Sequence, residues 1–399
     1  MKRIALVSAL MLLGSAAFAQ PSGEGSIARY AIDLDSWTPV TEYQLPDVLV
    51  CNDGKSVKNA RQWERKRRPE IMSIYEQEMF GKVPEKPQGL HFALSCPDQT
   101  VYDGKAVRRR VKIWLDADEK HGFEVLIHLP VHHDGRIPMF VGLNFRSVDD
   151  AFDGTRYQWP FEALVDEGFG LAMAFHSSIE PDGDEYAGLS ASVRSWYRPA
   201  ESWGAISAWA WGLSRIADYL ETLPEIDCSR MAVIGHSRLG KTALWAGAND
   251  PRFALVISNN SGCCGAATNA RMYGETFKNI FGTFPYWFVP EFGKYVGRDG
   301  EFPVDQNALV ALSAPRPVYI SSASEDHWAD PEGEWLTAVN SAPVYALYGL
   351  EGVAGPTMPA LGHCDDYGAV AYKIHSGIHA LWWDDWLDYI KYAKRCFGL

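Results

Sequence analysis

Short apolar runs alternate with longer amphipathic stretches through most of this chain of 399 residues. The short runs are mostly apolar, and they predict strands at 138–143, 168–175, 231–234, 254–258, 317–321 and 370–374. The longer stretches predict helices at 61–80, 204–223, 241–248 and 380–393. Strands that alternate with helices predict a parallel sheet with right-handed crossover connections.

The segment before this alternation has a different pattern. Two β-rich runs, 107–114 and 123–129, are joined by the polar stretch 116–122, which predicts an antiparallel hairpin. Residues 20–60 are rich in Pro, Asp and Asn and are expected to wrap the surface. With no repeat or low-complexity linker in the chain, we predict a single domain over residues 20–399. It should be a three-layer α/β sandwich, with a mostly parallel central sheet and an antiparallel N-terminal extension.

The first nineteen residues read as a signal peptide. Lys2 and Arg3 precede an apolar run over residues 4–13, and Ala17-Phe18-Ala19 supplies the small residues that a signal peptidase needs. The apolar run is shorter than the ~20 residues of a membrane-spanning helix. We therefore expect cleavage before Gln20 and an exported protein, either periplasmic or secreted.

Charge and composition exclude some partners. The formal net charge is −13 and long single-sign runs are absent, which argues against nucleic acid and against an anionic membrane surface. Fifteen tryptophans either fill a large core or in part line a carbohydrate site, since flat apolar rings stack on sugars. The spacing of the seven cysteines matches no zinc pattern, and their disulfide pairing cannot be read from the sequence.

The most specific local feature is the stretch 231–241. A β-branched strand leads into Gly235-His236-Ser237, and a helix follows directly, which is the strand–turn–helix context of a nucleophile elbow. The common G-x-S-x-G form is altered, because Leu239 stands where the last glycine is expected and glycine comes one residue later. We interpret Ser237 as the nucleophile of an α/β-hydrolase. The alternative is a serine that only caps the helix.

A serine nucleophile needs a base and an acid, which in this fold follow it in the chain in the order acid, then histidine. His379 is the best-placed base, in the loop between the last strand and the last helix, with His363 and His375 as rivals. The acid should follow the strand 317–321, where both Glu325 and Asp326 are available.

At these positions the chain resembles the glucuronoyl esterases, carbohydrate esterase family 15. The stretch Gly-His-Ser-Arg-Leu-Gly-Lys at 235–241 is similar to the family signature G-[CH]-S-R-x-G-K. Further agreement lies in 203–211, 259–263, 314–316, 326–334 and 372–379, and in Asp385-Trp386. The resemblance covers roughly residues 60 to 395.

The resemblance implies roles for four further residues. Arg238 would assist the oxyanion hole, because a fixed cation stabilises developing negative charge. Lys241 would bind hydroxyls of the glucuronoyl ring, Trp328 would stack on or bound that sugar, and Glu275 would match an acidic sugar contact of bacterial members.

Two departures from the fungal members concern the acid and a disulfide. Fungal relatives place a catalytic Glu where this chain has Asn260, and an amide carries no negative charge. The acid is then expected on the later loop, where Asp326 fits the bacterial pattern better than Glu325. The fungal cysteine beside the serine is replaced by His236, so its disulfide is not carried over.

The resemblance implies a secreted serine esterase that acts without a metal or organic cofactor. It would hydrolyse esters of (4-O-methyl-)glucuronic acid, as in lignin–glucuronoxylan cross-links, through a glucuronoyl-enzyme intermediate. The expected partner is this ester substrate, and the chain is expected to be a monomer. The alternatives are an acetyl xylan esterase-like deacetylase on the same fold and an inactive carbohydrate-binding relative.

Overall fold

The computed structural model describes residues 38–148, 159–183, 192–197, 199, 202–353 and 357–399. They belong to a compact unit that spans Leu34–Leu399. The predicted signal peptide, residues 1–19, lies outside the described residues, as do residues 20–37. The rest of the expected surface segment, 38–60, is mostly exposed or half-buried, as predicted.

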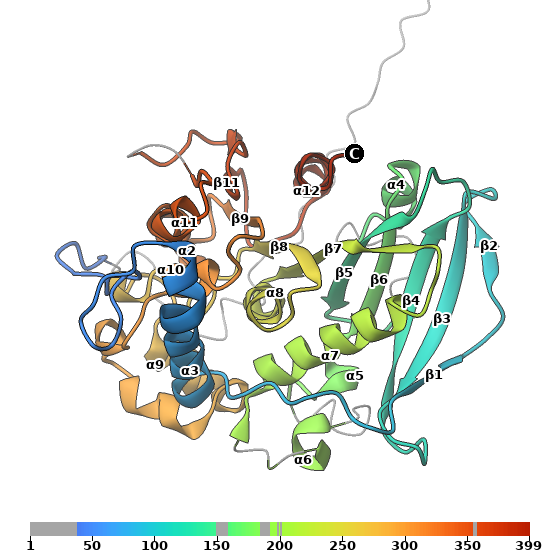
Figure 1. Ribbon diagram of the computed structural model, residues 1–399, viewed down its shortest axis with the longest axis horizontal. Coiled ribbons are helices and arrows are strands. Elements are labelled where there is room, and N and C mark those ends of the chain that lie inside the picture. Colours follow the sequence, from blue (N-terminus) through green and yellow to red (C-terminus); the bar gives the residue numbers. More distant parts are fainter. Residues whose placement is uncertain (1–37, 149–158, 184–191, 198, 200–201, 354–356) are drawn as a thin grey trace, which may run out of the picture. The chain divides into compact units, whose positions relative to one another are not determined.

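Six parallel strands form the centre of the sheet (Figure 1). Their spatial order is β6 (Gly170–Phe175), β5 (Ile137–Asn144), β7 (Ile226–His236), β8 (Phe253–Asn259), β9 (Val318–Ala323) and β11 (Val370–His375). All six predicted central strands are present. Their carboxyl ends share one edge of the sheet, where ligand sites of α/β folds lie.

Antiparallel strands extend the sheet on both sides. Beyond β6 come β4 (Gly122–Pro130), β3 (Ala106–Trp114) and β1 (His91–Leu94), and β2 (Gln99–Val101) also pairs with β3. The predicted hairpin is therefore confirmed as β3 and β4. At the other edge, the short β10 (Cys364–Asp365) pairs with β11.

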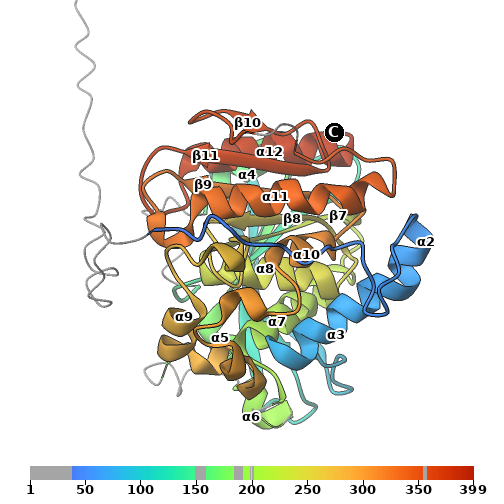
Figure 2. The same ribbon diagram turned by 90° about the vertical axis from the view of Figure 1, so that its left-hand side faces the viewer.

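Helices cover both faces of the sheet and complete three layers. One hydrophobic cluster includes side chains of α3 (Arg68–Glu78), α7 (Ala205–Leu220), α8 (Arg238–Asn249), α10 (Gln306–Ala311) and α11 (Pro331–Ala346). Figure 2 shows α11, α8 and α7 following one another across that face. On the other face, α4 (Phe161–Asp166) and α12 (Trp383–Phe397) belong to a second cluster. The predicted fold class is confirmed.

Shorter segments connect these layers. They are α2 (Ala60–Gln62), a π-helical turn (Trp63–Arg67), α5 (His176–Ile179), α6 (Val193–Tyr197), α9 (Phe277–Thr283) and 3₁₀ turns at Asn269–Arg271, Pro285–Trp287, Pro290–Tyr295, Asp299–Glu301 and His327–Ala329. Six tryptophans are fully buried: Trp63, Trp203, Trp209, Trp211, Trp245 and Trp386. For these six, the core is the correct interpretation.

Some expected boundaries were wrong in ways that affect the site. The helix expected at 241–248 begins at Arg238, so Arg238 and Lys241 lie in its first turn. The last helix begins at Trp383 instead of 380, which lengthens the loop that carries His379. The helix α11 was not predicted.

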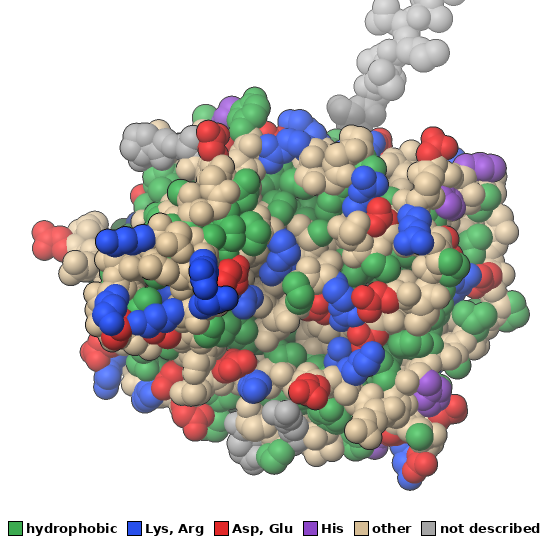
Figure 3. All heavy atoms as spheres, viewed as in Figure 1, with side chains coloured by type: hydrophobic (Ala, Val, Ile, Leu, Met, Phe, Trp, Pro, Cys, Tyr) green, Lys and Arg blue, Asp and Glu red, His purple; other side chains and the backbone are tan. Residues whose placement is uncertain are grey.

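The surface carries charges of both signs. On the face in Figure 3, basic and acidic side chains lie interspersed over most elements. In the part of the chain that the structure describes, no helix has the length and apolar character needed to cross a bilayer.

Candidate active site at the carboxyl ends of the strands

Ser237 occupies a strained turn between β7 and α8. Its φ of 58° and ψ of −128° lie outside the regions that L-residues favour, and such strain is typical of active sites. Its backbone N–H donates to the carbonyl oxygen of Asn259, 2.9 Å away, which ties the turn to the end of β8. The side chain is half-buried, at the N-terminus of a helix, as the elbow pattern predicts.

The glycines of this turn are imposed by close packing. A Cβ at position 235 would lie 1.8 Å from the carbonyl oxygen of Leu239, and one at 240 would lie 2.9 Å from Cβ of Ser261. The Leu239 side chain is buried in the core. Therefore Leu239 serves packing, and Gly240 allows the helix to approach the loop after β8.

The expected partner of His379 is present. Oδ2 of Asp326 lies 2.5 Å from Nδ1 of His379, and the carboxylate is almost fully buried, with 4% of its side chain exposed. Burial lowers the pKa of His379 and the Asp326 carboxylate raises it, with a net shift upward. The imidazole is 37% exposed, which leaves it reachable from outside. Asp326 follows β9 and His379 follows β11, two neighbouring parallel strands.

The rival residues have other surroundings. Glu325 is exposed, and its backbone N–H donates to the carbonyl oxygen of Gly377 at 2.8 Å. His375 is buried at the end of β11, where its Nε2 lies 3.8 Å from the carboxylate of Asp385. His363 is exposed in the turn before β10.

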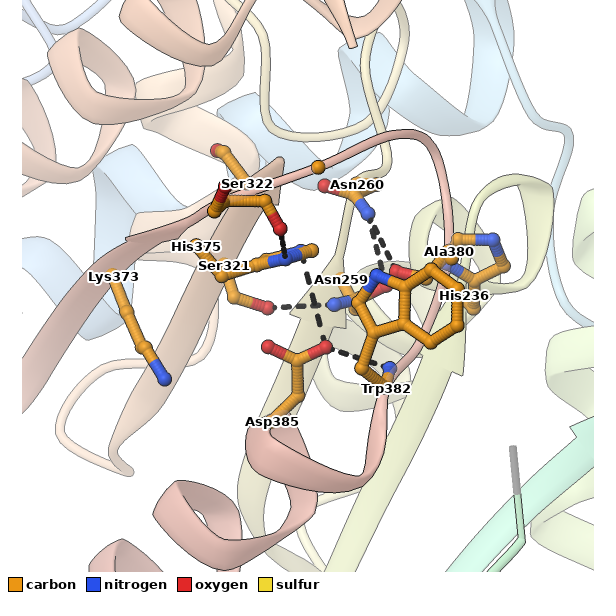
Figure 4. A network of polar contacts seen from close by, with 12 residues as sticks. His236, Asn259, Asn260, Ser321, Ser322, Lys373, His375, Ala380, Trp382 and Asp385 are labelled. Carbon is orange, nitrogen blue, oxygen red and sulfur yellow. Dashed lines mark hydrogen bonds and ion pairs between the residues drawn. The ribbon is translucent and has the colours of Figure 1, made fainter. Parts of the chain in front are cut away.

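Figure 4 shows a polar network around His236 and Asn259. The ring of His236 is 4.5 Å from that of His379, centroid to centroid, and its Nδ1 lies 2.5 Å from Oδ1 of Asn259. The amide nitrogen of Asn259 donates to the hydroxyls of Ser321 and Tyr389, at 2.9 Å each. Burial and the nearby His379 push the pKa of His236 well below its ordinary value. The residue beside Ser237 is thus a neutral, anchored imidazole against which His379 packs.

The side chain of Asn260 binds the backbone of the loop that carries His379. Asn260 has a φ of 46°, and its side-chain nitrogen Nδ2 donates to the carbonyl oxygen of Ala380 at 2.9 Å. Its contact is therefore with the residue after His379, through an uncharged amide.

Arg238 lies in a cage of aromatic rings and one carboxylate. Its guanidinium carbon is 4.7 Å from the ring centroid of Trp287, 5.0 Å from that of Phe284 and 5.8 Å from that of Phe145. One nitrogen pairs with Oδ2 of Asp182 at 2.5 Å. The cation is held directly beside Ser237, as an oxyanion role requires.

Lys241, one helical turn after Arg238 on α8, lies together with Glu275 and Trp328 from two later loops. The ammonium of Lys241 is 3.7 Å from Oε2 of Glu275 and donates to the carbonyl oxygen of Ser261. The backbone N–H of Glu275 donates to the carbonyl oxygen of Trp328 at 2.9 Å. Burial raises the pKa of Glu275, against the opposing charges of Lys241 and Arg238. All seven predicted site residues therefore fall in one region.

Two buried carboxylates near the site were not predicted. Glu334, on α11, accepts from the backbone N–H groups of Ser261 and Gly262 at 2.8 and 2.9 Å, and from the hydroxyl of Ser322 at 2.6 Å. Asp182 follows α5 and binds Arg238. The run 326–334 contained a signal for Glu334, whereas nothing in the local sequence singles out Asp182.

The geometry agrees with comparisons to known proteins. A family model described as glucuronyl esterase of fungi matches residues 168–349. The chain is 37% identical over 394 residues to carbohydrate esterase MZ0003 from an unknown prokaryotic organism, with 89% of this chain and 90% of that protein covered. It is 28% identical to 4-O-methyl-glucuronoyl methylesterase 1 of Wolfiporia cocos, covering 97% and 88% of the two chains.

Solved structures give the same result. The glucuronoyl esterase from Solibacter usitatus superposes with a TM-score of 0.84 at 37% identity, over 90% of this chain and 99% of that one. A promiscuous family 15 esterase from a marine bacterial metagenome gives 0.81 at 36% identity, covering 91% and 98% of the two chains. This chain belongs to the glucuronoyl esterases of carbohydrate esterase family 15.

Proposed function

We propose that this protein hydrolyses esters of glucuronic acid, with Ser237 as nucleophile, His379 as base and Asp326 as the acid of the triad. The observation that carries the proposal is the 2.5 Å contact between Nδ1 of His379 and Oδ2 of Asp326, beside the strained turn of Ser237. A serine hydroxyl needs such a base to react at neutral pH. Several relatives are named 4-O-methyl-glucuronoyl methylesterases, which supports the choice of ester.

The contact with Asp326 defines how His379 works. With the proton on Nδ1 directed at the carboxylate, Nε2 is free to take the proton of Ser237 as its oxygen attacks the ester carbonyl. The imidazolium that forms is stabilised by Asp326 and gives its proton to the departing alcohol. Water then attacks the glucuronoyl-enzyme by the same route, and free glucuronate leaves.

Arg238 and the start of α8 would stabilise the oxyanion. The negative charge develops beside Ser237, where the positive end of the helix dipole lies. The Arg238 guanidinium, held by Asp182, adds a charged donor in a partly buried setting, where such a donor acts more strongly than in water.

The sugar half of the substrate would bind at Lys241, Glu275 and Trp328. A cation and a carboxylate 3.7 Å apart can donate to and accept from neighbouring hydroxyls of one pyranose ring. The half-buried indole of Trp328 supplies an apolar face for that ring. Because the acyl group itself carries these hydroxyls, the site fits a uronate ester better than an acetyl ester.

We extend the proposal to the biological setting. The substrate would be the ester that joins 4-O-methyl-glucuronoyl side chains of xylan to lignin alcohols. The chain would act as a monomer after export and removal of residues 1–19, as one catalytic domain over residues 20–399.

A panel of esters tests the proposal. Purified enzyme should hydrolyse benzyl glucuronate and methyl glucuronate and release little acetate from acetylated xylan, with Ser237→Ala as the inactive control. Loss of the nucleophile in related triads costs ~10⁶-fold in rate. Efficient acetate release with no glucuronate turnover would establish a deacetylase. No turnover of any ester by the wild type would point to a binding protein, and one tenth of the activity in Ser237→Ala would refute the nucleophile.

A further inference from the structure

We propose that Asp182 is a positioning residue that holds Arg238 in place for oxyanion stabilisation. The inference rests on the role proposed above for Arg238. Asp182 follows α5, on a segment distant in sequence from the elbow, and its carboxylate is almost fully buried, with 4% of the side chain exposed. An unpaired carboxylate at such a depth would be costly, so its partners account for its presence.

Four polar groups converge on the two oxygens of this carboxylate. Oδ2 lies 2.5 Å from Nη1 of Arg238 and 3.1 Å from Nε2 of His176. Oδ1 accepts from the hydroxyl of Tyr286 at 3.0 Å and from the indole N–H of Trp287 at 2.8 Å. An ionised carboxylate offers about four acceptor sites, so the set is complete.

The charge of Asp182 is maintained by these neighbours. Burial acts to raise its pKa. The His176 hydrogen bond and the Arg238 charge lower the pKa by more than burial raises it, so the net shift is strongly downward. His176 is itself anchored, because its Nδ1 lies 2.9 Å from the carbonyl oxygen of Asn144 at the end of β5. The carboxylate is therefore a fixed negative charge tied to the sheet.

Trp287 contacts both Asp182 and Arg238. Its N–H donates to Asp182, while its ring lies 4.7 Å from the Arg238 guanidinium, a cation–π distance. Carboxylate, ring and cation thus restrain one another. An arginine side chain has many rotamers, so without this restraint the cation would sample positions away from Ser237.

The restraint leaves part of the guanidinium available to a ligand. Among the residues that the structure describes, Nη1 binds Asp182 and Nε is buried without a hydrogen-bond partner. The Arg238 side chain is nevertheless 27% exposed. A donor fixed before the reaction needs no reorganisation when the oxyanion forms. The structure therefore joins a buried anchor to a cation that remains accessible.

The amide variant Asp182→Asn removes the anchor with little change in size. An amide has one acceptor oxygen and brings its own N–H donors toward Arg238, so the four contacts of the carboxylate cannot all be kept. We expect kcat on benzyl glucuronate to fall about 10- to 100-fold with KM changed less than about 3-fold, because the lost interaction acts in the transition state.

A double-mutant cycle separates positioning from a purely structural role. If Asp182 acts through Arg238, adding Asp182→Asn to Arg238→Ala should change kcat by less than about 2-fold. Independent effects that multiply in the double variant would overturn the inference, as would full activity of Asp182→Asn.

The matched control is Asp218→Asn. Asp218 is a similarly buried carboxylate, and it pairs with Arg215 on α7 and with Arg252 in the loop before β8. It should lower the thermal unfolding temperature and leave kcat within about 2-fold.

A second variant and a second substrate complete the test of Asp182. If Asp182→Asn does not fold, Tyr286→Phe removes one donor to the same carboxylate, and its smaller loss of kcat should likewise vanish in the Arg238→Ala background. The same cycle on 4-nitrophenyl acetate needs no sugar. If Asp182 and Arg238 are coupled on 4-nitrophenyl acetate while the wild type does not hydrolyse glucuronate esters, the proposed substrate is refuted and the inference about Asp182 stands. If the wild type hydrolyses glucuronate esters but Asp182 and Arg238 are not coupled, the proposed substrate stands and the inference is refuted.

Discussion

Two adjacent acidic residues, Glu325 and Asp326, have opposite surroundings. Asp326 turns inward to His379 and is buried, whereas Glu325 is exposed. From the sequence alone both could serve as the acid, because adjacent loop residues differ in direction and not in chemistry. Only the fold of the loop between β9 and α11 determines which carboxylate meets the imidazole.

Replacing these two carboxylates by amides should have very different effects. Asp326→Asn lets the His379 ring take the wrong tautomer, which in serine enzymes costs up to ~10⁴-fold in kcat. Glu325→Gln should stay within about 3-fold of wild type. Steady-state kinetics on benzyl glucuronate measures both, and a Glu325→Gln enzyme slower than Asp326→Asn would contradict the assignment.

The same contact sets the pH dependence of the rate. His379 must be neutral to accept the serine proton, and its pKa is shifted above the ordinary value, with burial opposed by Asp326. Therefore kcat/KM should fall as the pH drops through this raised pKa. Asp326→Asn removes the largest contributions that raise this pKa, so the acidic limb of the residual activity should move to lower pH. An unmoved limb would assign it to another group.

Lys241 should affect sugar substrates selectively. The ammonium is buried between Glu275 and the carbonyl oxygen of Ser261. Lys241→Ala should raise KM for benzyl glucuronate by about 10-fold or more and change kcat less, if the contact is equal in ground and transition states. Turnover of 4-nitrophenyl acetate should change little. Equal losses on both esters would give Lys241 a structural role.

At the scale of elements, α11 supports the loop after β8. Its Glu334 accepts from two backbone N–H groups of that loop, and the loop in turn binds Lys241 through the carbonyl oxygen of Ser261. The sequence did not predict this helix. It begins with Asp330 and Pro331, which read as a helix start, but Pro343 interrupts the pattern and the side chains are apolar on more than one side. Packing between α10 and β9 stabilises it where local preference does not.

Glu334 should make stability depend on pH. Burial raises its pKa to about 7, from an ordinary value of 4.5. Between these values the folded state holds a proton that the unfolded chain releases, so the free energy of unfolding falls as pH rises from about 4.5 to 7. Glu334→Gln resembles the protonated form. Its free energy of unfolding should therefore fall by about 1 to 3 kcal/mol less than that of the wild type over this pH range.

Urea unfolding at several pH values measures this difference. Parallel curves for wild type and Glu334→Gln would contradict the shift. Glu334→Ala is the control, because it leaves the Ser261 and Gly262 N–H groups without their partner and should be destabilised at every pH.

At the scale of the whole molecule, stability should not depend on disulfides. All seven cysteines lie among the described residues and each is free. The only two sulfurs recorded near one another, those of the sequence neighbours Cys263 and Cys264, are 3.8 Å apart. We expect the same unfolding temperature with and without dithiothreitol, and seven reactive thiols after denaturation. A shift of several degrees would reveal a cross-link.

Local patterns predicted the architecture and the elbow, but not the whole site. The six central strands are continuous apolar runs, and the turn at Ser237 is encoded within seven residues, so both could be found by inspection. The pairing of Arg238 with Asp182 joins residues that are 56 positions apart. No local spacing encodes such a contact, which exists only because the segment after α5 and the start of α8 meet in the fold.

The order of the strands also has a consequence for biosynthesis. Ser237 and Asp326 are made well before His379, whose place is defined by β11 and by the turn into α12. Under the proposed triad, a nascent chain that has completed β9 possesses a nucleophile and an acid but no base. On that assignment, esterase activity should arise only with the final segment, and proteolytic loss of the C-terminus should abolish it while leaving Ser237 in place.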